Sequence, residues 1–263
     1  CPFEAGSRSL KRILETIIET LNLNRFLTNA AYRQIDPITP PLLFGPRARI
    51  PKSCIDECIK QWQKKEEKVR SKSIIGEVNG LYATSNGQGG ILPIQVTLID
   101  SSTHEFITTG SVGTTMLESM KVSKTVIMTL FNKKLKELGK DLSHCAIHIH
   151  ATDTAQEKDG PSAGSAITIA ILSSIYQKPM HHLGAITGEI DILGNITAIG
   201  GLQSKIQGAK SAGVTTIYYP TQNQDDIADI QQESPELLTD LTLISIASIL
   251  ELATHCFGDT KHP

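Results

Sequence analysis

Hydrophobic residues near the start of the chain follow a helical period and then give way to prolines. In residues 7–22 the apolar side chains recur every three or four positions, which predicts an amphipathic helix. These side chains are Leu10, Ile13, Ile17, Ile18 and Leu21. Residues 35–52 carry five of the twelve prolines and predict a linker rather than a regular element. Residues 54–70 are highly charged and predict a solvated connecting helix.

From residue 73 onward the pattern changes to that of strands and buried helices. Residues 74–85 and 89–100 predict two strands joined by the turn-forming sequence SNGQGG, and FITTGSV predicts a further short strand. Residues 112–138 predict a long helix. Residues 143–151 alternate strictly, which predicts a strand with one apolar and one histidine-bearing face. The apolar face carries Cys145, Ile147 and Ile149, and the other carries His144, His148 and His150.

The rest of the chain alternates short strands with helices. Residues 161–176 are apolar nearly all round, which predicts a buried helix. Further strands are expected near 183–187, 196–199 and 215–219, and further helices at 201–213 and 246–255. The pattern predicts an α+β (α/β-like) fold with mixed small sheets and packed helices. We divide the chain into a small helical segment (1–45), a linker with a charged helix (46–72) and one large domain (73–263).

Composition narrows the possible functions. The 263 residues are 40% hydrophobic and 20% charged with a net charge of −2, so there is no electrostatic argument for nucleic acid or a membrane surface. No apolar run approaches the ~18 residues needed to cross a bilayer, and the amphipathic N-terminal segment is unlike a signal peptide. The five cysteines predict neither a zinc site nor a disulfide framework. We therefore expect a reducing, cytoplasmic compartment, with an organelle matrix as the alternative.

The stretch 158-KDGPSAG-164 is the first candidate for chemistry. Pro161 suits the first position of a helix, which makes Ser162 a first-turn residue. Unpaired N–H groups and the helix dipole at that end could stabilise an oxyanion, which is worth roughly 3–4 kcal/mol per donor. A serine there can also be a simple capping residue, and a glycine-rich turn can bind phosphate. The phosphate reading is weaker, because the chain has no G-x-x-x-x-G-K-[ST] sequence.

A lysine with unusual surroundings is the second candidate. On a helix over 201–213, Lys205 shares the apolar stripe with Leu202, Ile206 and Ala209, whereas Lys210 lies on the opposite, solvated face. Such a lysine can lay its stem on the core and keep its charge in water. Alternatively, burial lowers its pKa, and a fall of about three units from ~10.4 would make it a base near neutrality.

Two arrangements with histidine remain open from the residues alone. A Ser162–His150–Asp159 triad is possible because triads are recognised by geometry rather than by sequence order. His148 and His150 also form an H-x-H pair that could bind a metal, but no third ligand is evident. We predict no metal site and give the two histidines a supporting role.

Six stretches in order resemble the proteolytic domain of Lon proteases and cover residues 75–230 without large insertions. They are 75-IGEVNGLYATSNGQGGILPIQ-95, 109-TGSVGTTMLESM-120, 147-IHIH-150, 158-KDGPSAG-164, 187-TGEIDILGNITAIGGLQSK-205 and 213-GVTTIYYP-220. This resemblance implies a serine endopeptidase with a Ser–Lys dyad, in which Ser162 is the nucleophile and Lys205 the general base.

The same resemblance implies roles for the neighbours of the dyad. Backbone N–H groups in the segment Gly160–Ala163, in which Pro161 itself has none, would form the oxyanion hole, and Thr187 would orient Lys205. From charge alone, Asp159 and Glu189 would raise the pKa of the lysine if they lay close to its ammonium. We therefore expect them to be held away from it, or Asp159 to move when substrate binds. Gln95 departs from the family, which usually has Glu at this position.

The N-terminal stretch 4-EAGSRSLKRILETI-17 resembles the end of an AAA+ helical subdomain, in which Arg8 would help to sense nucleotide. We expect ATP and Mg to act only through an ATPase module that this chain lacks, so the chain itself has no cofactor. The resemblance further implies a homo-oligomeric, hexameric ring that degrades unfolded proteins, with no membrane or nucleic-acid partner. The alternative is a catalytically idle assembly module with the same fold.

Overall fold

The computed structural model describes residues 68–84, 87–101, 105–139, 142, 145–152 and 160–258. The chain divides into two compact units, Cys1–Glu66 and Glu67–Pro263, and the described residues belong to the second. The predicted helix at 7–22, the linker, most of the charged helix and Arg8 lie outside the described residues. The three-part division of the chain therefore stays a prediction.

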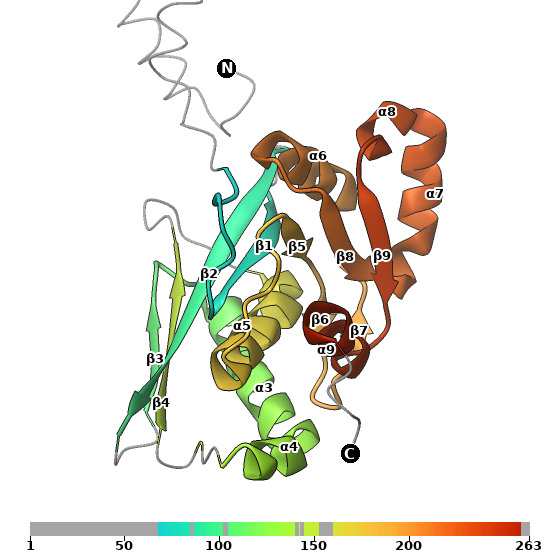
Figure 1. Ribbon diagram of the computed structural model, residues 1–263. Coiled ribbons are helices and arrows are strands. Elements are labelled where there is room, and N and C mark those ends of the chain that lie inside the picture. Colours follow the sequence, from blue (N-terminus) through green and yellow to red (C-terminus); the bar gives the residue numbers. More distant parts are fainter. Residues whose placement is uncertain are drawn as a thin grey trace, which may run out of the picture. The chain divides into compact units, whose positions relative to one another are not determined.

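A seven-stranded mixed sheet organises the second unit (Figure 1). In spatial order its strands are β3 (Phe106–Thr109), β4 (Cys145–Ala151), β2 (Gly89–Asp100), β1 (Glu77–Ala83), β5 (Gly184–Ile186), β8 (Thr216–Pro220) and β9 (Thr242–Ile246). Strand β2 is antiparallel to both of its neighbours, and the other adjacent pairs are parallel. A separate hairpin pairs β6 (Glu189–Ile190) with β7 (Ile196–Thr197). The α+β fold class is confirmed.

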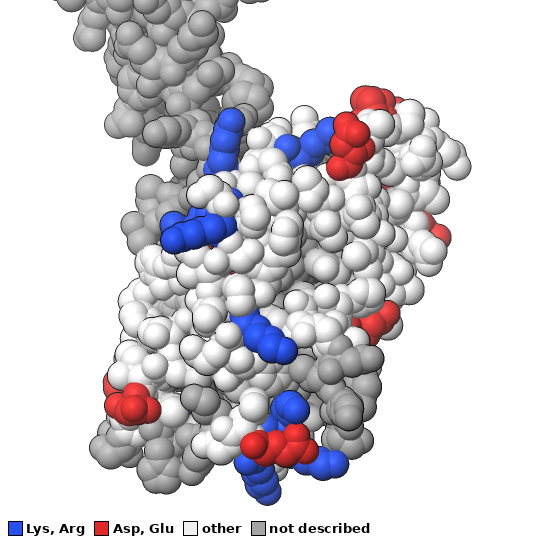
Figure 2. All heavy atoms as spheres, in the orientation of Figure 1, with Lys and Arg blue, Asp and Glu red and all other residues white. Residues whose placement is uncertain are grey.

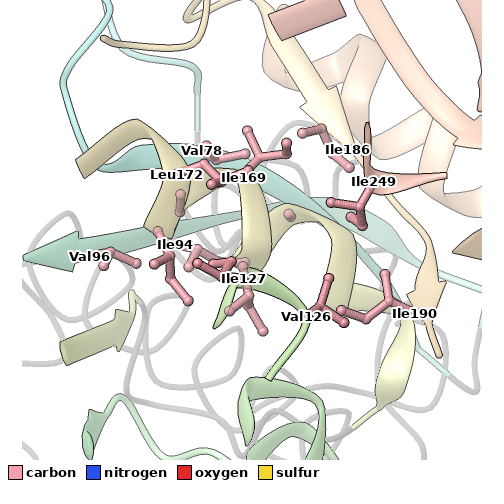
Figure 3. Packing of buried hydrophobic residues seen from close by; sticks show 14 of the residues in the cluster. Val78, Ile94, Val96, Val126, Ile127, Ile169, Leu172, Ile186, Ile190 and Ile249 are labelled. Atoms are coloured by element: carbon pink, nitrogen blue, oxygen red, sulfur yellow. The ribbon is translucent and has the colours of Figure 1, made fainter. Parts of the chain in front are cut away.

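Helices cover the two faces of the sheet with separate hydrophobic clusters. On one face lie α3 (Thr114–Leu130), α4 (Asn132–Glu137), α5 (Gly164–Tyr176) and α9 (Ile249–Phe257). On the other lie α6 (Leu202–Ala212), α7 (Gln224–Glu233) and the short α8 (Pro235–Leu238). Figure 3 shows side chains from β1, β2, α3 and α5 meeting in the first cluster.

Helix α5 shows why the sequence pattern works for this core. Twelve of its thirteen residues are buried, as predicted from its apolar composition, because α3, α9 and the sheet surround it. Its buried serines and threonine bond within the protein; Ser174 Oγ, for example, donates to the carbonyl of Val96 at 2.8 Å. The predicted helix over 112–138 forms two helices: α3 ends at Leu130, α4 begins at Asn132, and the buried Phe131 lies between them.

Charge is scattered rather than concentrated on the face seen in Figure 2. Basic and acidic side chains of the described residues form several small groups there, some with both signs side by side, and no large patch of one sign is seen. In the part of the chain that the structure describes, no helix is long and apolar enough to span a bilayer.

Candidate active site

Ser162 lies where the chain turns into the buried helix α5. Gly160 has a φ of 143°, which favours glycine, and Pro161 then opens a single 3₁₀ turn, Pro161–Ala163, that continues directly into α5. Ser162 is half-buried and Ala163 is buried. The first N–H groups of a helix have no preceding helical carbonyl to bond. The predicted location of Ser162 in the first helical turn is therefore what the structure shows.

Lys205 lies on the buried side of α6 and is only 3% exposed. Its ammonium donates a hydrogen bond to the hydroxyl of Thr187, with 3.2 Å between Nζ and Oγ1, and Thr187 is itself 1% exposed. Burial disfavours the charged form of the amine and lowers the pKa of Lys205 from 10.5 to about 8. A substantial fraction of this side chain is consequently an uncharged amine slightly above neutral pH.

The dipeptide Thr187–Gly188 connects the serine turn to the lysine helix. The N–H of Gly188 donates to the carbonyl of Ser162 at 2.9 Å, while the preceding residue accepts the hydrogen bond from Lys205. Ser165 binds the Gly188 carbonyl twice, from its N–H at 3.1 Å and from its hydroxyl at 2.9 Å. One short segment thus holds both candidate residues in the same neighbourhood.

This neighbourhood lies at the carboxyl edge of the parallel strands. Strand β5 ends at Ile186, immediately before Thr187, and the Thr187 N–H donates to the carbonyl of Tyr218 on the adjacent β8 at 3.0 Å. Helices α5 and α6 both begin at this edge, since each leads back into a parallel strand. In sheets of this kind the carboxyl edge is where ligands commonly bind. The fold therefore brings together residues from three separated stretches of sequence.

Sequence reasoning missed Ser165, although a signal was present. It is 0% exposed and lies three residues after Ser162, in a run of small residues that suits close packing. Gly164 illustrates that need, because a Cβ there would lie 3.0 Å from Ile190. A polar residue at such a position must find a partner, and only the fold reveals that the partner is Gly188.

The two histidines share a partner on the neighbouring strand. Nε2 of His148 and Nδ1 of His150 lie 3.1 and 2.8 Å from Oγ1 of Thr109 on β3. Both are half-buried on the sheet face opposite Ile147 and Ile149, as the alternation predicted. His144 and Asp159 lie outside the described residues, so the Ser162–His150–Asp159 triad stays an open alternative. No group of three metal-ligating side chains occurs among the residues described.

Three other sequence expectations can be placed. Glu189 is half-buried at the start of β6, opposite Thr197 of the hairpin. Lys210 is not simply solvated as expected, because its Nζ donates to the carbonyl of Glu236 at 2.7 Å, which ties α6 to α8. Gln95 is hydrogen-bonded to Glu77.

The amide of Gln95 completes a small polar network on β1 and β2. Its Nε2 donates to Oε2 of Glu77 at 2.7 Å, and Oε1 of the same carboxylate pairs with Nε of Arg70 at 2.6 Å. A glutamate at position 95 would place a second carboxylate against Glu77. Glutamine at position 95, in place of the glutamate expected from the resemblance, therefore suits the carboxylate of Glu77.

Comparisons with known proteins agree with this architecture. Residues 49–257 match the family model described as Lon protease (S16) C-terminal proteolytic domain, which defines the class of the chain. A Lon protease homolog of Acanthamoeba polyphaga mimivirus is 32% identical over 95% of this chain and 29% of its own length. The Lon protease of Acinetobacter baumannii is 37% identical over 68% of this chain and 22% of its own length.

A fungal relative extends the likeness to nearly the whole chain. The protein named Lon protease homolog 2, peroxisomal, of Eremothecium gossypii is 29% identical over 98% of this chain and 26% of its own length. The chain belongs to the Lon protease family. It spans less than a third of the length of these relatives.

Proposed function

We propose that this chain is a serine endopeptidase of the Lon type, with Ser162 as nucleophile and Lys205 as general base. One observation carries the proposal. The buried amine of Lys205 is hydrogen-bonded to Thr187, and the next residue, Gly188, is hydrogen-bonded to the carbonyl of Ser162. A nucleophilic hydroxyl needs a base with a pKa near the working pH, and burial brings the pKa of Lys205 to about 8.

The reaction proceeds in two halves. Uncharged Lys205 accepts the proton of the Ser162 hydroxyl as its oxygen bonds to the peptide carbonyl carbon, and the carbonyl oxygen becomes an oxyanion. The C–N bond then breaks, and the leaving amine takes the proton from Lys205. Water attacks the acyl-enzyme with Lys205 again accepting a proton, and this proton returns to the Ser162 oxygen as the acid product leaves.

Stabilisation of the oxyanion falls to the serine turn. The N–H groups of Ser162 and Ala163 belong to the first turn of the helix, where no helical carbonyl accepts them, and the dipole of α5 favours negative charge there. Loss of one such donor typically costs roughly 3–4 kcal/mol of transition-state stabilisation. The neutral Thr187 hydroxyl orients the amine without adding a charge that would raise its pKa.

Unfolded proteins are the proposed substrates, delivered by an AAA+ ATPase module through which alone ATP and Mg would act. We further infer a homo-oligomeric, hexameric ring, which sedimentation velocity would test, and a cytoplasmic or organelle-matrix location, which a fluorescent fusion would test. These proposals rest on the family, whose relatives are much longer than this chain.

Casein degradation and hydrolysis of fluorogenic peptides test the catalytic assignment. Ser162→Ala and Lys205→Ala should each abolish turnover, whereas Lys210→Ala, on the same helix with its amine bonded to a surface carbonyl, should retain it. Activity that survives in Lys205→Ala but not in His150→Ala would replace the dyad by the triad. Wild-type protein that forms rings but cleaves neither substrate would favour the idle assembly module.

A further inference from the structure

Helix α6 and strand β2 touch through their backbones, and glycines make this contact possible. A Cβ on Gly208 would overlap the carbonyl of Gly89 and the N–H of Gly90. From the other side, a Cβ on Gly89 would overlap the carbonyl of Ser204 and lie 2.9 Å from the backbone nitrogen of Lys205. Real Cβ atoms essentially never approach so closely, so any side chain at Gly208 must move the helix or the strand.

The contact lies beside the proposed catalytic base. Gly208 follows Lys205 by three residues, which places both on neighbouring parts of the helix surface. The strand residues beneath them belong to the first two positions of β2, where it pairs with the end of β1. Beside this contact, on the stripe that includes Lys205, the side chains of Leu202, Ile206 and Ala209 anchor the helix in the second hydrophobic cluster. The backbone contact that fixes the distance between α6 and β2 therefore lies next to Lys205.

We propose that Gly208 is a positioning residue for Lys205: because it lacks a side chain, α6 lies directly on β2 and the lysine ammonium reaches the Thr187–Gly188 segment. This inference rests on the proposed dyad. Gly208 touches neither the substrate nor the reacting atoms, and it acts only through the location of the helix. Sequence alone gives it no such role, since a glycine inside a helix usually only weakens that helix.

The size of the expected effect follows from the geometry of catalysis. A misplacement of about 1 Å in a catalytic group can cost on the order of 10²-fold in rate. A helix lifted from the sheet also admits water to Lys205, and hydration returns the pKa of a buried amine toward its ordinary value. Because alanine is the better helix former, we expect Gly208→Ala to shift α6 rather than unfold it.

The experiment compares Gly208→Ala with two controls in the whole chain. Gly76→Ala introduces a similar overlap, with the carbonyl of Val96, just before the start of β1 at the opposite edge of the sheet. Gln207→Ala alters an exposed neighbour on the same helix. Three properties are measured: kcat and KM for a fluorogenic peptide across pH, thermal stability, and the pKa of Lys205. The last comes from NMR of ¹³Cε-labelled lysine, with the signal assigned through Lys205→Ala.

Gly208→Ala should lower kcat about 100-fold with little change in KM, and should raise the pKa of Lys205 from about 8 toward 10.5. Gly76→Ala should lose stability but keep the pKa of Lys205 and the kcat of its folded fraction. The proposal is overturned if Gly208→Ala keeps the wild-type pKa and kcat, if it matches Gly76→Ala, or if it does not fold. Turnover that survives in Ser162→Ala or Lys205→Ala would instead refute the proposed dyad, and the NMR titration would still report on Gly208.

Discussion

Replacing Lys205 with methionine should make the protein more stable at neutral pH while abolishing activity. Lys205 is 3% exposed, and burial lowers its pKa from 10.5 to about 8. At about 1.4 kcal/mol per pKa unit, this fall corresponds to roughly 3 kcal/mol by which protonated Lys205 destabilises the folded state. Methionine has a similar length and no charge, so Lys205→Met retains the packing and removes this cost.

The methionine also removes a hydrogen bond, which reduces the net gain in the free energy of unfolding. Loss of the bond to Thr187 leaves a buried hydroxyl with one partner fewer and costs about 1 kcal/mol. We therefore expect Lys205→Met to gain about 2 kcal/mol in the free energy of unfolding at pH 7. By pH 11 the wild-type lysine is mostly uncharged in both states, so the variant should be about 1 kcal/mol less stable than wild type.

The sign of the pH dependence follows from proton binding. Because the folded pKa of Lys205 is depressed, the unfolded state binds more protons between about pH 8 and 10.5, and this residue makes stability rise with pH in that window. Burial also raises the pKa values of Cys256 and Tyr176 to about 12, which makes stability fall above about pH 9. These opposing groups are present in both proteins and cancel in the difference between variant and wild type.

Urea unfolding followed by far-UV circular dichroism at several pH values from 7 to 11 measures that difference. Lys210→Met is the matched control, because it removes the same charge from the same helix but its ammonium bonds a surface carbonyl. It should give no gain at pH 7. If Lys205→Met is no more stable than wild type at pH 7, or if the difference is constant from pH 8 to 10.5, Lys205 is not a desolvated amine and the reasoning fails.

Three further substitutions test the surroundings of the site. Thr187→Val removes the acceptor for the buried ammonium and should lower kcat at least about tenfold in peptide assays, with recovery in Thr187→Ser. Ser165→Ala removes one of two hydrogen bonds to the Gly188 carbonyl and should cost about 1 kcal/mol in urea unfolding. Gln95→Glu places a carboxylate against Glu77 and should cost about 1 kcal/mol in urea unfolding at pH 7.

The sequence predicted the elements whose burial is encoded in local periodicity. Helix α5 and strand β4 have unambiguous patterns, because one is buried on all sides and the other on alternate positions. Helix α7 was not predicted, since only Ile227, Ala228 and Ile230 among its ten residues are apolar and most of its surface is exposed. Strand β9 was also missed; its five residues form an edge strand that is mostly half-buried, so its alternation is weak.

Part of the candidate active site could be predicted from the sequence for the same reason. The burial of Lys205 follows from its place on an apolar helical stripe, which a single sequence displays. The bond between Gly188 and Ser162, and the contact of Gly208 with Gly89, join segments that lie far apart in the chain. Such approaches depend on how the strands are ordered in the sheet. Local periodicity contains no information about that order.

A double substitution can separate the steric and electrostatic consequences of the contact between α6 and β2. In wild type, any lifting of α6 by Gly208→Ala also hydrates Lys205 and relieves part of its burial cost. With methionine at position 205 no such relief exists, so Gly208→Ala should destabilise the Lys205→Met protein by about 1 kcal/mol more than wild type at pH 7. By pH 11, where the lysine is mostly uncharged in both states, the two losses should converge. Equal losses at pH 7 in urea unfolding would show that Gly208 only leaves room for β2 and does not govern the surroundings of the Lys205 amine.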